Sequence, residues 1–136
     1  MTSPHQFLHP SHWKATPGYS NGMAATGRLV VTGGMVGWNA DQQFISDDFA
    51  DQAGLALRNI VAVLAEAGAR PDHIVRLTWY VTDKRAYLDS LPELGRAYKT
   101  AIGRHYPAMA LVQVVALVED RALVEIEATA VIPEGA

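Results

Sequence analysis

The sequence has no cysteine, so disulfides, thiolate nucleophiles and cysteine-containing metal sites are excluded. It has no hydrophobic run long enough to cross a bilayer, since the longest nearly apolar stretch covers only residues 108–118, and no signal-peptide pattern opens it. Basic residues are few: 11 Lys and Arg stand against 14 Asp and Glu, giving a net charge of -3. This balance offers no attraction to nucleic acid or an anionic membrane. We therefore expect a cytoplasmic protein that binds neither.

The chain does have enough apolar side chains for one domain, because 136 residues at 49% hydrophobic content bury a core without cross-links. The first 22 residues are rich in His, Pro, Ser and Gly and show no periodicity. They predict a loosely held N-terminal arm whose packing, if any, comes from Trp13. We place the arm at residues 1–16 and a single domain at residues 17–136.

Local patterns predict strands, a helix, a strand, a second helix and two final strands, which indicates the α+β class. The strands are expected as a pair within residues 23–38 with a tight turn and a glycine interruption, then at 73–82, 109–117 and 122–132. The first helix follows an N-cap at residues 46–48 and ends at Gly68. The second begins at Ser90 with a possible capping box to Glu93, or near Arg85 with Pro92 as a kink.

Two helices cover only one face of such a sheet, yet the strand at residues 109–117 is apolar on both faces apart from Gln113. The other face needs cover from elsewhere. A partner subunit is the simplest source in so small a chain, so the pattern predicts a homo-oligomer.

The final strand carries two carboxylates, Glu125 and Glu127, which strand alternation places on the same face. Partly desolvated carboxylates at that spacing raise each other's pKa, and one can then act as a general base for water. The alternative is a pair of solvated carboxylates on an exposed strand. Spacing alone leaves both interpretations open.

Two interpretations stay open for each of the other polar and aromatic side chains. The side chain of Gln113 is either a contact to a ligand or a neighbouring subunit, or a core glutamine bonded to backbone. Trp38, after the glycine pair Gly33 and Gly34, lines a pocket or fills a subunit contact. The glycine pair lets a ligand approach closely, but it lacks the spacing of a dinucleotide-binding loop.

The histidines are not expected to form a site. His5, His9 and His12 have spacing that binds a metal on a helix, but the prolines at positions 4 and 10 argue against a helix there. His73 and His105 are expected at the surface. We therefore predict no metal.

Six collinear segments together resemble the RidA/YjgF family of enamine and imine deaminases, over residues 17–132. They are GYSNG at 18–22, the strand at 29–33 with its glycine, LxNIxAVLxxAG at 57–68, DxIVRLTxYVTD at 72–83, YPA at 106–108 and ALVEIEATA at 122–130. The resemblance implies a chorismate-mutase-like fold: a mixed sheet with two helices on one face, and a homotrimer with an inner β-barrel and a cleft at each subunit interface.

The resemblance also implies cofactor-free hydrolysis of a reactive enamine or imine to a keto acid and ammonia. In the family a tyrosine lines the cleft and a glutamate positions water; these match Tyr19 and Glu125. The arginine that binds the substrate carboxylate is replaced by Met109. Three further family positions also differ. Leu111 stands where the family often has a small polar residue or Cys, Leu91 where it commonly has Asn, and Gln113 where it frequently has Glu.

Each of these replacements removes polarity or charge, so we expect a less acidic ligand, such as an aromatic, cyclic or thioester-linked enamine or imine. Glu125 would direct water, helped by backbone groups near Gly33 and Gly34. The alternative is a non-catalytic trimer that binds or senses an apolar metabolite. Ribonuclease or translation-inhibitor activity, attributed to some relatives, is disfavoured by the acidic balance.

Overall fold

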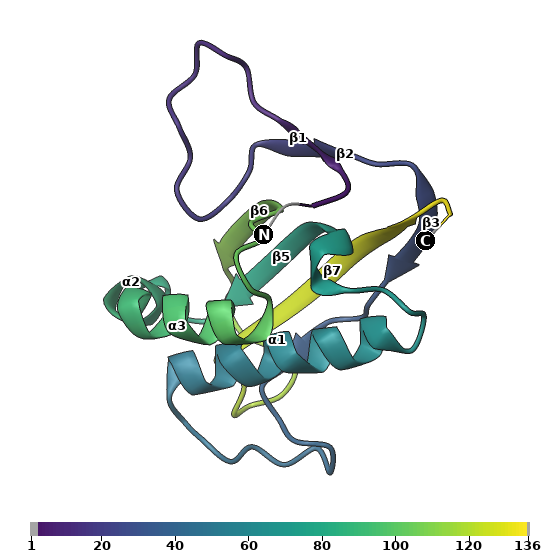
Figure 1. Cartoon of the computed structure of the whole chain (residues 1–136). Coiled ribbons are helices and arrows are strands. Elements are labelled where there is room, and N and C mark those ends of the chain that lie inside the picture. Colours follow the sequence, from purple (N-terminus) through teal and green to yellow (C-terminus); the bar gives the residue numbers. More distant parts are fainter. Residues whose placement is uncertain (1–2, 136) are drawn as a thin grey trace.

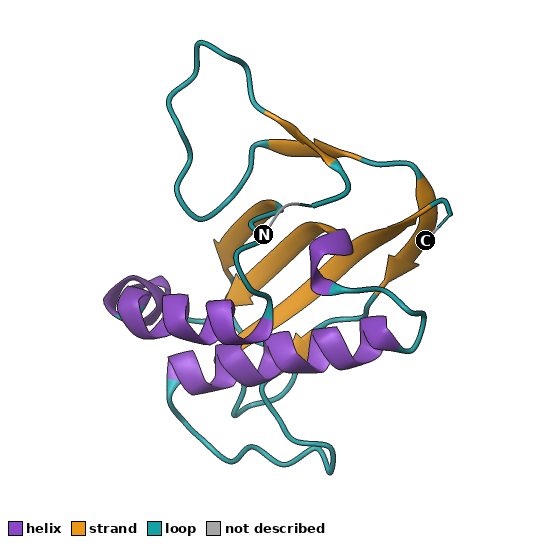
Figure 2. Ribbon diagram, in the orientation of Figure 1, coloured by secondary structure: helices purple, strands orange, loops and turns teal. Residues whose placement is uncertain are grey.

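The computed structural model describes residues 3–135 as a mixed sheet with helices on one face (Figures 1 and 2). The helices are α1 (Phe49–Ala65), α2 (Lys84–Asp89) and α3 (Leu91–Ala101), with a 3-10 turn η1 (Pro71–His73). The strands are β1 (Gln6–Leu8), β2 (Gly22–Ala24), β3 (Gly27–Val31), β4 (Met35–Val36), β5 (Ile74–Val81), β6 (Ala108–Gln113) and β7 (Val124–Pro133). The expected α+β class with a mixed sheet is confirmed.

β7 organises the main sheet. It pairs antiparallel with β3, β4 and β5, and β5 pairs parallel with β6. The strand pair expected within residues 23–38 is therefore wrong in its pairing, because β3 and β4 lie one after the other along β7. Thr32 continues the ladder by bonding the backbone of Ala128, and the glycines that follow interrupt it.

Helix α1 forms as its pattern predicts. The Asp48 side chain accepts from the backbone N–H of Asp51, and Gly68 follows the helix with a φ of 79°, which favours glycine. Its apolar stripe is fully buried against the sheet, including Leu57, Ile60 and Leu64. This stripe supplies much of the hydrophobic core.

The second helical segment is broken at Ser90 into α2 and α3, with Pro92 in the first turn of α3. A helix beginning at Ser90 describes α3, and a start near Arg85 describes α2, so each alternative from the sequence is right for one of the two helices. The capping box is wrong: the Ser90 hydroxyl donates to the carbonyl oxygen of Ala86 and makes no cap bond.

The two faces of the sheet differ in cover. Along β7, Val124, Ile126, Ala128 and Ala130 are buried under the helices, whereas Glu125 and Glu127 are half-buried on the other face. No helix covers that second face among residues 3–135 (Figure 1). Leu29 and Val31 of β3 lie there with 65% and 62% of their surfaces exposed.

The N-terminal arm is not held by Trp13, which is 53% exposed. β1 instead pairs with β2, and His5 bonds the carbonyl of Val131 at 2.7 Å. Phe7 packs on His105, with ring centroids 5.9 Å apart. The boundary between arm and domain stays a prediction.

The surface positions expected for His73 and His105 are wrong, because each is only 1% exposed. His73 Nδ1 accepts from the backbone N–H of Arg70, and His105 Nε2 donates to the carbonyl of Ile74. The Ile74 carbonyl is distant from His105 in the sequence and leaves no local signature, whereas Arg70 is close to His73 and caps the same 3-10 turn. In the described part of the chain, no helix is both long and apolar enough to span a membrane.

Candidate functional site

Glu125 lies in a hollow of about 300 Å³ on the uncovered face of the sheet. Its carboxylate rests against Gly34: a Cβ built on that glycine would stand 2.1 Å from Glu125 Oε2. The carboxylate has no hydrogen-bond partner within residues 3–135. Gly34 thus leaves space for a half-buried carboxylate that is free to act on a ligand. The hollow is lined by Gly34, Tyr80, Val114, Ala116, Leu117, Val118, Glu125 and Glu127.

Tyr80 shares this hollow and donates its hydroxyl hydrogen bond to Glu127 Oε1. That hydrogen bond, followed by burial and by the charges of Glu127 and Glu125, raises the pKa of the Tyr80 phenol. Tyr80 is also the β-sheet partner of Glu125 across β5 and β7. One carboxylate is therefore bonded to the phenol while the other remains free.

Met109 and Leu111 lie in a different place, a cavity of about 180 Å³ between the sheet and α2 and α3. Two of its tyrosines, Tyr98 and Tyr106, stack with ring centroids 5.4 Å apart. Tyr98 donates to the carbonyl of His105, and burial raises the pKa of its phenol. The lining residues are Gly18, Trp79, Tyr87, Leu91, Leu94, Gly95, Tyr98, Tyr106, Met109 and Leu111.

Strand register explains why the two groups are apart. Glu125 pairs with Tyr80, whereas Met109 pairs with Leu77, whose side chain lies on the helix-covered face. Neighbouring residues of a strand point to opposite faces. A single subunit therefore cannot bring Glu125 and Met109 into one site.

The other predicted residues divide between these regions and the rest of the surface. Tyr19 is 41% exposed beside the apolar cavity, since its neighbour Gly18 lines the cavity and Ser20 bridges to Ala108. Gln113 is exposed, not buried in the core, and its side-chain oxygen accepts from the backbone N–H of Lys84.

Trp38 and Gly33 line neither region. The Trp38 ring packs on Phe44, with centroids 5.7 Å apart. A Cβ on Gly33 would touch only the end of Met35, at 3.8 Å. Binding roles for all these residues stay predictions.

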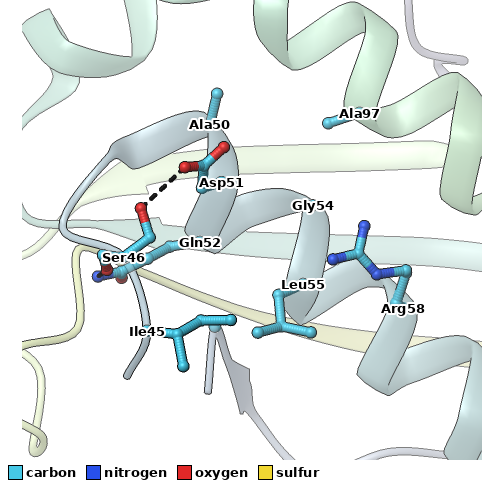
Figure 3. Close-up of a pocket in the computed structure, with 10 residues that line it drawn as sticks. Ile45, Ser46, Ala50, Asp51, Gln52, Gly54, Leu55, Arg58 and Ala97 are labelled. Atoms are coloured by element: carbon cyan, nitrogen blue, oxygen red, sulfur yellow. Dashed lines mark hydrogen bonds between the residues drawn. The ribbon is translucent and has the colours of Figure 1, made fainter. Parts of the chain in front are cut away.

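A third hollow, also of about 300 Å³, lies along α1 and contains none of the predicted site residues (Figure 3). The Ser46 hydroxyl donates to the Asp51 carboxylate at 2.8 Å, and the Arg58 guanidinium lies one helical turn beyond Gly54. Sequence reasoning missed this hollow, and also missed the roles of Trp79, Tyr80 and Tyr98 as lining residues. Only strand and helix phase, combined with topology, would have found them.

The three N-terminal histidines do not converge. His5 is buried against Val131, whereas His9 is exposed and contacts Asn21. Within the described chain, no group of three or more His, Cys, Asp or Glu side chains is arranged to hold a metal.

Comparison with known proteins places this geometry in a family. Residues 10–132 match the model of the family described as Endoribonuclease L-PSP. TdcF of Escherichia coli (strain K12) is 34% identical over 108 residues, which are 77% of this chain and 80% of TdcF.

The 2-iminobutanoate/2-iminopropanoate deaminase of Salmonella typhimurium is 30% identical over 108 residues, again 77% of this chain and 80% of the relative. Among solved structures, YyfB of the conserved Rid protein family, from Yersinia pestis, has a TM-score of 0.83 at 28% identity. The match covers 94% of this chain and 98% of YyfB. With a family match over most of its length, the chain belongs to the Endoribonuclease L-PSP family, the RidA/YjgF family that its motifs indicated.

Proposed function

We propose that the chain hydrolyses a reactive enamine or imine, releasing ammonia, and that its substrate lacks the free carboxylate that the family's arginine binds. One observation carries the proposal: the sheet has a partner-free carboxylate, Glu125, on one face and an apolar cavity walled by Met109 on the other. The deaminase name of the Salmonella relative supports the reaction class. A cytoplasmic location stays part of the proposal.

Glu125 is the catalytic residue in this reaction. A water oxygen bonds to the imine carbon, and Glu125 accepts the proton that the water loses and passes it to the imine nitrogen, which gives a neutral carbinolamine and restores the carboxylate. Glu125 then carries a proton from the new hydroxyl to the nitrogen as the C–N bond breaks, so a carbonyl compound and ammonia leave. No electrons are transferred. General base catalysis of this kind typically contributes about 10²–10⁴ in rate.

The complete site forms between subunits of a homotrimer. The opposite facing of Glu125 and Met109 supports this, because one subunit's carboxylate then meets its neighbour's cavity. The exposed Leu29 and Val31 on the uncovered face also favour burial in an assembly. The inner barrel implied by the family resemblance would bury these side chains. Sedimentation at micromolar concentration is expected to give three times the chain mass; a stable monomer would overturn this part.

Substrate preference follows from Met109. A hydrogen bond between charged groups contributes about 1.5–3 kcal/mol, so a carboxylate that meets methionine instead of arginine binds more weakly by about one to two orders of magnitude. Methionine and Leu111 instead contact apolar or flat groups well.

The test is ammonia release from freshly generated 2-aminoacrylate and from its uncharged methyl ester, for the natural chain and Met109→Arg. We expect the natural chain to favour the ester and Met109→Arg to gain at least about tenfold on the acid. Met109→Leu is the matched control and should not gain. A natural chain already fast on the acid, with no gain from arginine, would show that the preference for an uncharged substrate is wrong.

The apolar cavity also favours a second function, non-catalytic binding of an apolar metabolite. Glu125→Gln distinguishes the two. Hydrolysis requires that ammonia release vanish in this variant while the trimer persists, whereas ligand-induced melting shifts without turnover indicate binding alone. RNA cleavage abolished by Glu125→Gln would contradict both proposals in favour of the activity in the family's description. The net charge of -3 argues against that activity.

A further inference from the structure

The main sheet has an irregularity close to Glu125. Val31, the last residue of β3, pairs with Thr129, and Met35, the first residue of β4, pairs with Ile126. Three residues between β3 and β4 therefore stand opposite two residues of β7, which makes a β-bulge of one extra residue. Bulges re-aim side chains and are over-represented next to active sites. This bulge contains the glycine pair.

The bulge decides which residue lies beside Glu125. Paired residues of a ladder share a face, and a shift of one residue moves a side chain to the other face. Without the extra residue, Met35 would pair with Glu125 and would lie on the uncovered face. With it, Met35 packs against the hydrophobic core, and Gly34 lies against the Glu125 carboxylate. The bulge therefore replaces a methionine side chain by glycine backbone at the candidate site.

Thr32 supports the bulge through its side chain, which is buried. Its backbone N–H donates to the carbonyl of Ala128 at 2.9 Å. In a regular ladder the Ala128 N–H would return this bond to the Thr32 carbonyl, but here it donates to the Thr32 hydroxyl oxygen, at 3.0 Å. The same hydroxyl donates to the carbonyl of Gly33 at 2.8 Å. One side chain thus joins β7 to the glycine pair.

We propose that Thr32 is a positioning residue for the hydrolysis: its hydroxyl holds the bulge in the form that packs Gly34 against Glu125, and this sets the direction of the carboxylate. The proposal rests on the proposed function, in which Glu125 is the general base. The Glu125 carboxylate makes no hydrogen bond within residues 3–135, so its direction depends on the atoms packed against it. All these contacts lie within one subunit and are independent of how subunits assemble.

The test compares Thr32→Val, which keeps the shape and loses the hydroxyl, with Thr32→Ser, which keeps the hydroxyl. A misplaced catalytic group costs up to about 100-fold in rate, so kcat for ammonia release from the methyl ester of 2-aminoacrylate should fall about 10- to 100-fold in Thr32→Val. Its KM should change by less than about twofold, because the apolar cavity is untouched. Thr32→Ser offers the same donor and acceptor, so its kcat should stay within about threefold of the natural chain.

Ile60→Val is the control for lost stability alone. Ile60 is fully buried in α1, and shortening it destabilises the fold at a site that does not contact the bulge. Its kcat should equal that of the natural chain. A kcat that falls as far in Ile60→Val as in Thr32→Val would overturn the proposal, because general loss of stability would then explain both.

Nitrogen-15 spectra of glycine-labelled protein provide a readout that needs no activity. The Gly34 amide peak is the one that Gly34→Ala removes. It should shift in Thr32→Val and stay in place in Thr32→Ser, because only the first variant releases the bulge. A Gly34 peak that stays in place in Thr32→Val would overturn the proposal.

The proposal is also overturned if Thr32→Val keeps its kcat, or if Thr32→Ser loses as much of it as Thr32→Val. The serine variant retains both hydrogen bonds, so it tests the proposal even if the valine variant does not fold. Ammonia release that does not depend on Glu125, with the Gly34 peak shifting as expected, contradicts the proposed hydrolysis alone. Glu125-dependent ammonia release that is unchanged in Thr32→Val contradicts the role of Thr32 alone.

Discussion

The two faces of the sheet differ in the side chains that line their hollows. The uncovered face carries two carboxylates and a phenol around Gly34, with no cationic side chain lining the hollow. The helix-covered face carries a cavity lined by aromatic and aliphatic side chains and glycines. The first hollow contains carboxylates that can exchange protons, and the second has no Asp, Glu, Lys, Arg or His among its lining residues.

The difference teaches that binding and chemistry are specified separately in this chain. A substitution at Met109 alters the covered face and leaves Glu125 untouched, because the two side chains point in opposite directions. Under the proposed function, substrate preference can therefore change without loss of the catalytic group. The largest effect is expected from a substitution that alters one face and leaves the other unchanged.

Gly34→Ala should abolish the chemistry without altering the cavity. The added Cβ would stand 2.1 Å from Glu125 Oε2 and 2.7 Å from its Cδ, so the carboxylate must move. It is the end of a flexible side chain, and the fold should tolerate the shift. We expect ammonia release to fall by at least about 100-fold, as for loss of a general base. The affinity of the cavity for a small apolar probe, acetophenone, should be unchanged.

Gly33→Ala is the matched control, because its Cβ meets only Met35 Cε, at 3.8 Å. Its ammonia release should stay within about twofold of the natural chain. Equal losses in both variants, or an acetophenone affinity that falls with the activity in Gly34→Ala, would break the separation of the two faces.

A smaller effect is expected from acid, and it acts on the covered side. Burial lowers the pKa of His73, helped by the charge of Arg70, and burial also lowers the pKa of His105. The carboxyl of Asp72 opposes both shifts, and His5 adds to both. The carbonyl of His105 holds Tyr98, a cavity residue, so protonation there disturbs the cavity side.

The sign follows from the lowered pKa values. Below about pH 6.5 the unfolded chain binds protons that the folded chain excludes, so this stability is complete above that pH and is lost as the pH falls. The free energy of unfolding, measured by urea titration, should decrease from pH 7.5 to 5.0, by up to about 1.4 kcal/mol per pH unit for each proton taken up. His73→Gln should flatten this dependence, whereas His12→Gln, at an exposed position, should not. A flat profile in the natural chain would contradict this account.

Much of the fold was predictable because its signals are local. The stripe of α1, its cap at Asp48 and the alternation along β7 each lie within one segment, and the structure confirms them. The burial of His105 was not predictable, because the carbonyl that it bonds, that of Ile74, lies 31 residues away along the chain. The contact of His73 with the backbone of Arg70 is local, and the prediction missed it. The pairing of β3 and β4 with β7 is also non-local.

The candidate site was predictable only in part, for the same reason. The motifs predicted Glu125 and Met109 as site residues, but no motif shows that their side chains lie on opposite faces of the sheet. The cavity draws residues from five stretches of chain, and Trp79 and Tyr98 enter it only through strand and helix phase. A pattern within one segment cannot report a surface assembled from several.

The smallest expected effect distinguishes the two carboxylates of the uncovered face. Tyr80 holds Glu127 by a hydrogen bond, and this leaves Glu125 as the free carboxylate. In Tyr80→Phe the Glu127 carboxylate loses its donor and competes with Glu125 for protons and water. Ammonia release should therefore fall by only a few fold, because Glu125 still reaches the water. Glu127→Gln in the same background removes the competing base and should restore the rate. If Tyr80→Phe alters stability alone and leaves the rate of ammonia release in place, the phenol is only a structural contact, and the two carboxylates are not distinguished by it.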